Sequence, residues 1–382
     1  MAITAAQRIL LGNAFRPHAP IEDPGSFVGR EVELESVRDA IAANGLHVIL
    51  YGERGCGKTS LANVATSGVP RVQVFCEENA TFASLLSDAA IKYQAAHPDD
   101  ITFDAITDSI QTRGIRLPAS RLTGNTFLQL LVPNEPLCIV FDELDRVIDK
   151  SLIASLAELA KNAATYFPHL TLVMVGADST ADGLLAGHLS NFRNLRQVPL
   201  TRMSVPELYS ILTRGESVLD ITFNQAVKDE MVTMSDQMPY YLHLLATSAA
   251  KSALNRDSTV VEAQDLRAGA IGAAGDVDHS LRNIYEFAAL SEKGSSIYRR
   301  LIWAMASMDG AVCNVGTINE RANELARQER DRDVTPQALG AALKKLMSQD
   351  KGSVVVQVMA GNYKFRHPLM KGFVRLMRHS SQ

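Results

Sequence analysis

Five short apolar runs are spaced along the first half of the chain, and stretches with helical periodicity lie between them. The runs cover residues 46–51, 71–75, 138–141, 171–175 and 196–200. Continuous apolar runs of this length are typical of strands that are covered on both faces, as in a parallel sheet. The alternation of such strands with helices predicts an α/β fold, which we place at residues 23–202.

From Ser204 onward the pattern becomes helical. Capping boxes begin at Ser204 and at Thr222, where a hydroxyl residue is followed three positions later by Glu or Gln. Together with the long helical run at 238–254, they predict a small all-α lid over residues 203–277.

The pattern of apolar residues changes again in the last third of the chain. Apolar residues recur at helical spacing near 297–308 and 335–347, and SVVVQVMAGNYKFRHP then predicts two strands joined by a turn at Ala360, Gly361 and Asn362. Helices followed by a hairpin predict a winged-helix domain at residues 278–382. At the other end of the chain, the turn signals PHAP and EDPG predict an N-terminal arm over residues 1–22.

The composition is that of an ordinary folded protein. The chain has 382 residues, of which 46% are hydrophobic and 21% charged, which fits two or three globular domains. No apolar run is long enough to span a bilayer and the N-terminus lacks a secretory pattern, so we expect a cytoplasmic protein without membrane contact. The 4 cysteines have neither metal nor disulfide spacing, as expected in a reducing compartment.

The net charge of −4 is unevenly distributed. Residues 296–382 hold 14 Lys and Arg against 7 Asp and Glu, which is a net charge of +7 and leaves −11 for the rest. A basic tail of this kind is expected to meet nucleic acid or to dock on an acidic surface of its own chain.

The segment GERGCGKTS follows the first predicted strand and has the spacing G-x-x-x-x-G-K-[ST]. Its glycines let the backbone bend so that N–H groups point at a phosphate, and the helix that follows adds its positive dipole end. Lys58 supplies a charge for the β- and γ-phosphates, and Thr59 offers a hydroxyl to Mg²⁺. The predicted nucleotide-binding residues here are Gly52, Gly55, Cys56, Gly57, Lys58, Thr59 and Ser60.

A second motif, CIVFDELDR, places an acidic pair at the end of a buried strand. In open α/β sheets ligands bind at the carboxyl ends of the strands. Asp142 is therefore expected to hold Mg²⁺, directly or through water, and Glu143 to orient or deprotonate the attacking water. The two motifs together predict ATP hydrolysis.

The chain resembles a known group of ATPases. FVGRE at residues 27–31, the phosphate loop, the Asp-Glu strand end, the strand end at 173–178 and a helical lid before a winged helix are together similar to AAA+ ATPases. Within that group, the chain is similar to STAND-type signalling ATPases and to bacterial and archaeal ATPases that resemble origin-recognition initiators. The resemblance implies that Phe27, Val28 and Gly29 line the adenine pocket.

The resemblance also implies roles for residues outside the two motifs. Asp178 falls where relatives keep a γ-phosphate sensor, usually Asn; the alternative is a turn residue that caps the next helix. Arg193 or Arg196 matches an arginine finger that reaches a neighbouring subunit, unless it is a surface arginine. Pro239 matches a lid proline that packs on adenine. His367 matches a histidine that contacts the β-phosphate of ADP, the alternative being a buried histidine satisfied by backbone.

These features together favour a molecular switch. No arginine follows Pro239 where many AAA+ proteins keep a second sensor, which favours a switch over a fast motor. We expect slow, Mg²⁺-dependent ATP hydrolysis in which ADP bridges Lys58 and His367 in a closed monomer, and ATP frees the tail for assembly into a homo-oligomer.

Two other functions stay open at this point. A DNA-binding ATPase would assemble on duplex DNA through a basic tail that includes Lys344 and Lys345. A scaffold without turnover would bind nucleotide only. In the switch hypothesis, a separate effector or sensor protein is expected to supply the signalling output.

Overall fold

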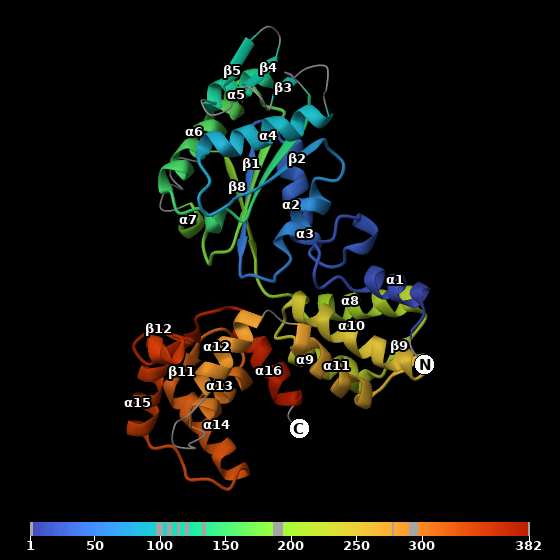
Figure 1. Cartoon of the computed structure of the whole chain (residues 1–382), viewed down its shortest axis with the longest axis vertical. Coiled ribbons are helices and arrows are strands. Elements are labelled where there is room, and N and C mark those ends of the chain that lie inside the picture. Colours follow the sequence, from blue (N-terminus) through green and yellow to red (C-terminus); the bar gives the residue numbers. More distant parts are fainter. Residues whose placement is uncertain are drawn as a thin grey trace. The chain divides into compact units, whose positions relative to one another are not determined.

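The computed structural model describes residues 3–96, 102–104, 109–112, 115–118, 122–131, 135–185, 194–276, 279–289 and 297–380. The chain divides into two compact units (Figure 1). The first unit is residues 18–202, and the second is residues 1–17 together with 203–382. Among the helices described, none has the length and apolar character that crossing a membrane requires.

The first unit is built on a five-stranded parallel sheet in the order β2-β6-β7-β1-β8. All five predicted strands are confirmed, with ends that differ by one residue at most. Their bounds are β1 (His47–Gly52), β2 (Arg71–Phe75), β6 (Leu137–Asp142), β7 (Leu170–Gly176) and β8 (Leu195–Leu200). Strands β6 and β7 are buried along their whole length, which explains why the sequence has nearly continuous apolar runs at these positions.

Helices cover both faces of this sheet (Figure 1). They are α2 (Glu31–Ala42), α3 (Lys58–Ala65), α4 (Phe82–Ala96), α5 (Gly124–Leu130), α6 (Lys150–Tyr166) and α7 (Ala181–Leu184), with the short η1 (Pro24–Ser26) and η3 (Leu144–Arg146). A small antiparallel sheet of β3 (Thr102–Asp104), β4 (Ser109–Thr112) and β5 (Ile115–Pro118) follows α4; the sequence analysis did not predict it.

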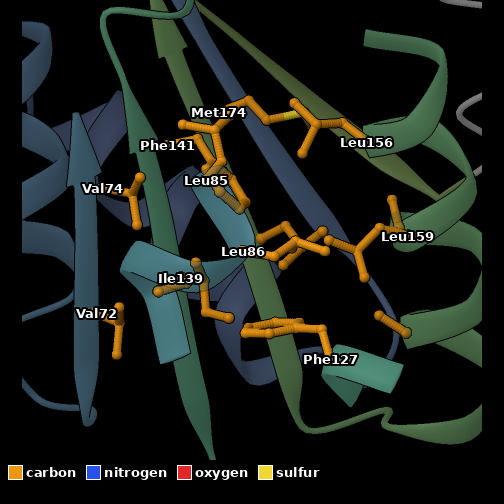
Figure 2. Packing of buried hydrophobic residues seen from close by; sticks show 14 of the residues in the cluster. Val72, Val74, Leu85, Leu86, Phe127, Ile139, Phe141, Leu156, Leu159 and Met174 are labelled. Atoms are coloured by element: carbon orange, nitrogen blue, oxygen red, sulfur yellow. The ribbon is translucent and has the colours of Figure 1, made fainter. Parts of the chain in front are cut away.

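The core under α4, α5 and α6 positions the ends of the strands. Figure 2 shows side chains of β2 and β6 packed against residues of these helices. Burial of each large apolar side chain contributes about 1.5–3 kcal/mol. The contacts fix β6 between β2 and β7, and Asp142 therefore stands at a defined place on the carboxyl edge of the sheet. The labelled members are Val72, Val74, Leu85, Leu86, Phe127, Ile139, Phe141, Leu156, Leu159 and Met174.

The second unit begins with a helical lid. Residues 203–276, called the lid below, form α8 (Val205–Leu219), β9 (Thr222–Phe223), α9 (Gln225–Met234), α10 (Pro239–Asn255), β10 (Val260–Val261) and α11 (Ala263–Asp276). The predicted all-α character thus holds except for one two-residue strand pair.

The N-terminal segment also belongs to this unit. Where the sequence analysis expected an arm, the structure has helix α1 (Ala5–Ala14), which packs on α8 and α10. A capping box of Thr4 and Gln7 begins this helix, and the buried Phe15 follows its end. Gly215 leaves the space for the Phe15 ring, since a Cβ there would lie 2.1 Å from it.

The rest of the second unit combines helices with a three-stranded antiparallel sheet in the order β11-β13-β12. The hairpin is found where the sequence predicts it, with Gly361 in the turn at φ 73°. We call α13 to α16 with this sheet the C-terminal module. The bounds are α12 (His279–Ala289), α13 (Ile297–Ser307), β11 (Cys313–Asn314), α14 (Val315–Gln328), α15 (Pro336–Met347), η5 (Gln349–Lys351), β12 (Val355–Met359), β13 (Asn362–Phe365) and α16 (Met370–Ser380).

Candidate active site

The phosphate-loop motif forms a tight connection between β1 and α3. Gly52 has φ 152°, and a Cβ at this position would lie 2.1 Å from the carbonyl oxygen of Leu200 in β8. Gly55 and Gly57 have φ 85° and 89°, and Gly57 is the N-cap of α3. Side chains other than glycine rarely adopt such backbone angles, so the spacing of the glycines is a geometric requirement of the loop.

Lys58, the first residue of α3, folds back over the loop. Its ammonium donates hydrogen bonds to the carbonyl oxygens of Gly52 at 3.0 Å and Glu53 at 2.8 Å. Burial lowers the pKa of Lys58, an effect that the nearby Asp145 and Asp142 carboxylates oppose. Because a phosphate is an anion and a backbone carbonyl is neutral, a phosphate would compete well for this ammonium.

Thr59 and Asp142 bring a hydroxyl and a carboxylate together. Asp142 is 2% exposed, and it accepts hydrogen bonds from the Thr59 side chain, from the Glu143 N–H at 2.8 Å and from the Gln73 side chain at 3.4 Å. Burial raises the pKa of Asp142, while these hydrogen bonds lower it. Hydroxyl and carboxylate oxygens are the ligands that Mg²⁺ prefers. The pair therefore fits a magnesium site.

The donor set of this site is small. Within the described part of the chain, no group of three or more His, Cys, Asp and Glu residues could hold a metal. Mg²⁺ usually keeps several waters and is held by one or two protein groups together with substrate phosphates. Thr59 and Asp142 beside a phosphate loop match that mode of binding.

Glu143 follows Asp142 in the left-handed conformation, with φ 57° and ψ 36°. Its carboxylate is 49% exposed and accepts a hydrogen bond at 2.8 Å from Arg146, which raises the pKa of that guanidinium. An exposed ion pair of this kind is weak, because water and salt screen the two charges. The Glu143 carboxylate can therefore exchange Arg146 for a water molecule at little cost.

Two ion pairs that the sequence analysis missed hold the phosphate loop on either side. Asp145 accepts hydrogen bonds from Arg54 of the loop at 2.9 Å and from the N–H of Ala177, just after β7, at 2.8 Å. Glu53 pairs with Arg202 at 3.0 Å. The repeated acidic pattern in DELD is the signal that could have pointed to Asp145. No local pattern marks Arg202, because its partner lies far away in the sequence.

The predicted adenine segment has a well-defined conformation. Phe27 and Val28 are half-buried, and Gly29 is buried at φ 75°. Arg30 is also left-handed, at φ 64°, and donates to the Thr201 carbonyl oxygen. These contacts fix the segment against the end of β8. A role toward adenine stays a prediction.

Two loop residues have structural contacts of their own. The Ser60 hydroxyl accepts a hydrogen bond from the Ile21 N–H at 3.0 Å, which ties α3 to the chain ahead of the adenine segment. Cys56 is buried, and burial raises the pKa of its thiol. A thiol with a raised pKa is a poor nucleophile. A role of Cys56 in nucleotide binding stays a prediction.

The structure gives Asp178 a turn contact and leaves the arginine finger untested. The Asp178 carboxylate accepts a hydrogen bond from the Thr180 N–H at 3.0 Å, directly before α7. This is a turn contact, as in the alternative given above, but the N-cap of α7 is Thr180 rather than Asp178. A γ-phosphate sensor role stays a prediction. Arg196 is exposed on β8, the edge strand of the sheet. Arg193 lies outside the described residues.

Pro239 and His367 belong to the second unit. Pro239 is buried at the first position of α10. His367 is half-buried, and its Nδ1 accepts a hydrogen bond from the Leu369 N–H at 3.3 Å. The backbone contact fits the alternative given above, although His367 is half-buried rather than buried. The roles of both residues toward nucleotide stay predictions.

Comparison with known families agrees with this site. Residues 26–174 match the family described as the AAA ATPase domain, and the matched segment contains the adenine segment, the phosphate loop and the Asp142–Glu143 strand end. Over these residues the chain is similar to the AAA ATPase domain. In this domain the phosphate loop and the acidic strand end lie at the same edge of one parallel sheet. A comparison with curated protein sequences finds no match.

Solved structures extend the similarity beyond the AAA ATPase domain. A Walker-type ATPase of Pyrococcus abyssi is 17% identical, with a TM-score of 0.55 over 94% of this chain and 99% of that one. The Aeropyrum pernix ORC2 protein, solved as ADPNP-ADP complexes, is 16% identical, with a TM-score of 0.50 and 97% of both chains covered. CDC6P of Pyrobaculum aerophilum is 14% identical, with a TM-score of 0.50 over 97% of this chain and 99% of that one. These structures share the fold along nearly the whole length.

Proposed function

We propose that this protein is a Mg²⁺-dependent, ATP-hydrolysing switch in which the bound nucleotide controls the position of the C-terminal module and self-assembly. The observation that carries the hydrolytic part is the arrangement of Lys58, Thr59 and Asp142 at the carboxyl edge of the sheet, with Glu143 next to them. The match to the AAA ATPase domain supports it.

Each residue has a defined task in this proposal. Lys58 leaves the loop carbonyls to pair with the β- and γ-phosphates, and Thr59 and Asp142 hold Mg²⁺. The metal supplies charge neutralisation on the phosphate oxygens. Glu143 orients a water for attack on the γ-phosphate and takes its proton. Arg193 or Arg196 would complete the site from a neighbouring subunit.

The switch part of the proposal rests on the second unit. The order of α13, α14, α15 and the β12–β13 hairpin supports a winged helix, which Pro239 and His367 would connect to the nucleotide. After Pro239 the next arginine along the chain is Arg256, beyond the end of α10. The absence of an earlier arginine supports slow turnover and two long-lived states.

One observation favours a second candidate, a DNA-assembled ATPase. Lys344 and Lys345 are exposed side by side near the end of α15. Exposed lysines can neutralise phosphates of duplex DNA, and such binding weakens steeply as salt is raised. Assembly that needs DNA, rather than ATP alone, would favour this candidate.

Replacement of Glu143 tests the hydrolytic part directly. We expect Glu143→Gln to lower the rate of ATP hydrolysis by about 10²–10⁴-fold, because the amide cannot take the proton of the attacking water. ATP affinity should change by no more than a few-fold, because Lys58 and Thr59 are intact. The measurement is phosphate release with Mg²⁺ and with EDTA, together with binding of a fluorescent ATP analogue.

The control is Glu158→Gln on α6, which removes the same charge from an exposed position. This variant should hydrolyse ATP at the wild-type rate. A wild-type protein without Mg²⁺-dependent phosphate release, or a Glu143→Gln variant with full activity, would contradict the proposal.

A further inference from the structure

A buried cluster of charges joins the lid to the C-terminal helix α16. Asp236, in the turn between α9 and α10, is 7% exposed, and its Oδ1 lies 3.1 Å from the Lys371 ammonium and 3.2 Å from the Arg375 guanidinium. The Lys371 and Arg375 side chains are 3% and 13% exposed. Buried charges are costly unless they are paired and hydrogen-bonded. The two cations of α16 and the lid carboxylate therefore depend on one another.

Arg375 extends the cluster to both sides. Its guanidinium donates to the carbonyl oxygens of Thr233 in the lid at 2.6 Å, Ala306 at 2.7 Å and Met308 at 3.0 Å. Ala306 lies in the last turn of α13 and Met308 directly follows this helix. Lys371 donates to the nearby Gly310 carbonyl oxygen at 2.7 Å. One arginine side chain thus links the lid, α16 and α13.

An aromatic residue adds a further contact between the lid and α16. Tyr241 of α10 is fully buried, and its hydroxyl donates to the Leu369 carbonyl oxygen just before α16. A Cβ at Gly372 would lie 2.4 Å from the Tyr241 ring, so the backbone of α16 packs directly against this ring. Helix α16 also packs on α11 of the lid and on α13 (Figure 1).

The turn that carries Asp236 has two further connections. Asp236 and Gln237 are consecutive left-handed residues at φ 53° and 62°, and the turn leads directly into Pro239. The Gln237 carbonyl accepts a hydrogen bond at 3.0 Å from the N–H of Met203, the first lid residue. The same turn therefore contacts the start of the lid, the predicted adenine-contacting proline and α16.

We infer that the cluster of Asp236, Lys371 and Arg375, called the Asp236 clamp, holds the lid and the C-terminal module together as one rigid body. A change of nucleotide would then move the two together. The inference rests on the proposed function, in which nucleotide state moves the module. Release of the module from the lid would break the bonds of Asp236, Thr233 and Tyr241 at once. Movement at the two chain connections between the units, at residues 17–18 and 202–203, breaks none of these bonds. In the ATP state the lid and the C-terminal module therefore move together relative to the first unit, and the module does not separate from the lid.

Distance measurements between spin labels test the clamp. One pair, Lys251→Cys in α10 and Gln337→Cys in α15, reports lid against module; the other, Lys161→Cys in α6 and Gln337→Cys, reports first unit against module. All three positions are exposed. The native cysteines are buried, and burial raises the pKa of Cys76 and Cys138 to about 12, so labelling favours the introduced thiols.

We expect the lid–module distance to be the same with ADP and with a non-hydrolysable ATP analogue. The distance from the first unit to the module should shift by more than the width of its distribution. A shift in both distances would overturn the clamp and leave the switch standing. An unchanged distance from the first unit would overturn the switch and the clamp together.

A variant gives an independent measurement. Asp236→Asn leaves Lys371 and Arg375 without their carboxylate, so the lid–module distribution should broaden or become dependent on nucleotide. Asp220→Asn is the matched control, because Asp220 is an exposed lid residue with a similar left-handed conformation, φ 52°. The same narrow distribution in wild type and Asp236→Asn would overturn the role of Asp236.

Discussion

Gly52 stands where β1 passes into the phosphate loop, against the backbone of β8. We expect Gly52→Ala to destabilise the first unit by about 2–4 kcal/mol, because the added Cβ would meet the Leu200 carbonyl at 2.1 Å and neither backbone can move freely inside the sheet. ATP binding should fall with it. Urea unfolding followed by circular dichroism measures the loss.

The control is Gly68→Ala in the same unit. No atom lies within 4 Å of a Cβ there, and Gly68 is exposed. Its free energy of unfolding should stay within about 0.5 kcal/mol of wild type. Equal stability of the two variants would contradict the geometry given for the loop.

His243 gives the second unit a dependence on pH. Burial, with a smaller effect from Arg214, lowers the pKa of His243 to about 4. Between pH 4 and 6.5 the unfolded chain binds the proton more readily than the folded one. The free energy of unfolding should therefore be highest above about pH 6.5 and fall by about 3 kcal/mol as the pH falls toward 4.

The single tryptophan, Trp303, lies in the same unit and reports its unfolding by fluorescence. We expect His243→Phe to flatten the profile between pH 4.5 and 6.5, since the ring already packs against Phe15. The exposed His279→Gln should leave the profile unchanged. A profile that keeps its slope in His243→Phe would assign the pH dependence to other groups.

At the level of single residues, the sequence was sufficient where function imposes a fixed local spacing. Gly52, Lys58 and Asp142 were predicted because a phosphate loop and an acidic strand end have short, specific patterns. Asp145 and Arg202 were not predicted, because what defines them is a partner elsewhere in the fold. A local sequence pattern cannot predict ion pairs between residues that are far apart in the chain.

At the level of elements, the strands could be predicted because burial on both faces leaves an unbroken apolar run. Helix α1 was missed because the turn signals after it outweighed the capping box at Thr4. Helix α16 was missed for a different reason. Lys371 and Arg375 lie on its inner side, where helical periodicity calls for apolar residues, and only the carboxylate of Asp236 accounts for them.

At the level of the whole molecule, the basic tail has a partner within the chain. Arg300 is buried and pairs with Glu329 at 2.9 Å and Asp331 at 2.6 Å, while Lys371 and Arg375 pair with Asp236 of the lid. Part of the positive charge is therefore used inside the second unit. This favours the interpretation that the tail docks on its own chain. Lys344 and Lys345 are exposed and stay candidates for contact with DNA.

The central claim is that the bound nucleotide sets the conformation and assembly of the protein. Size-exclusion chromatography with light scattering tests it, with ADP and with a non-hydrolysable ATP analogue, each with and without duplex DNA. We expect a monomer with ADP and a larger, defined assembly with the ATP analogue, formed without DNA. The same mass with both nucleotides, or an assembly that forms only on DNA, would contradict the switch.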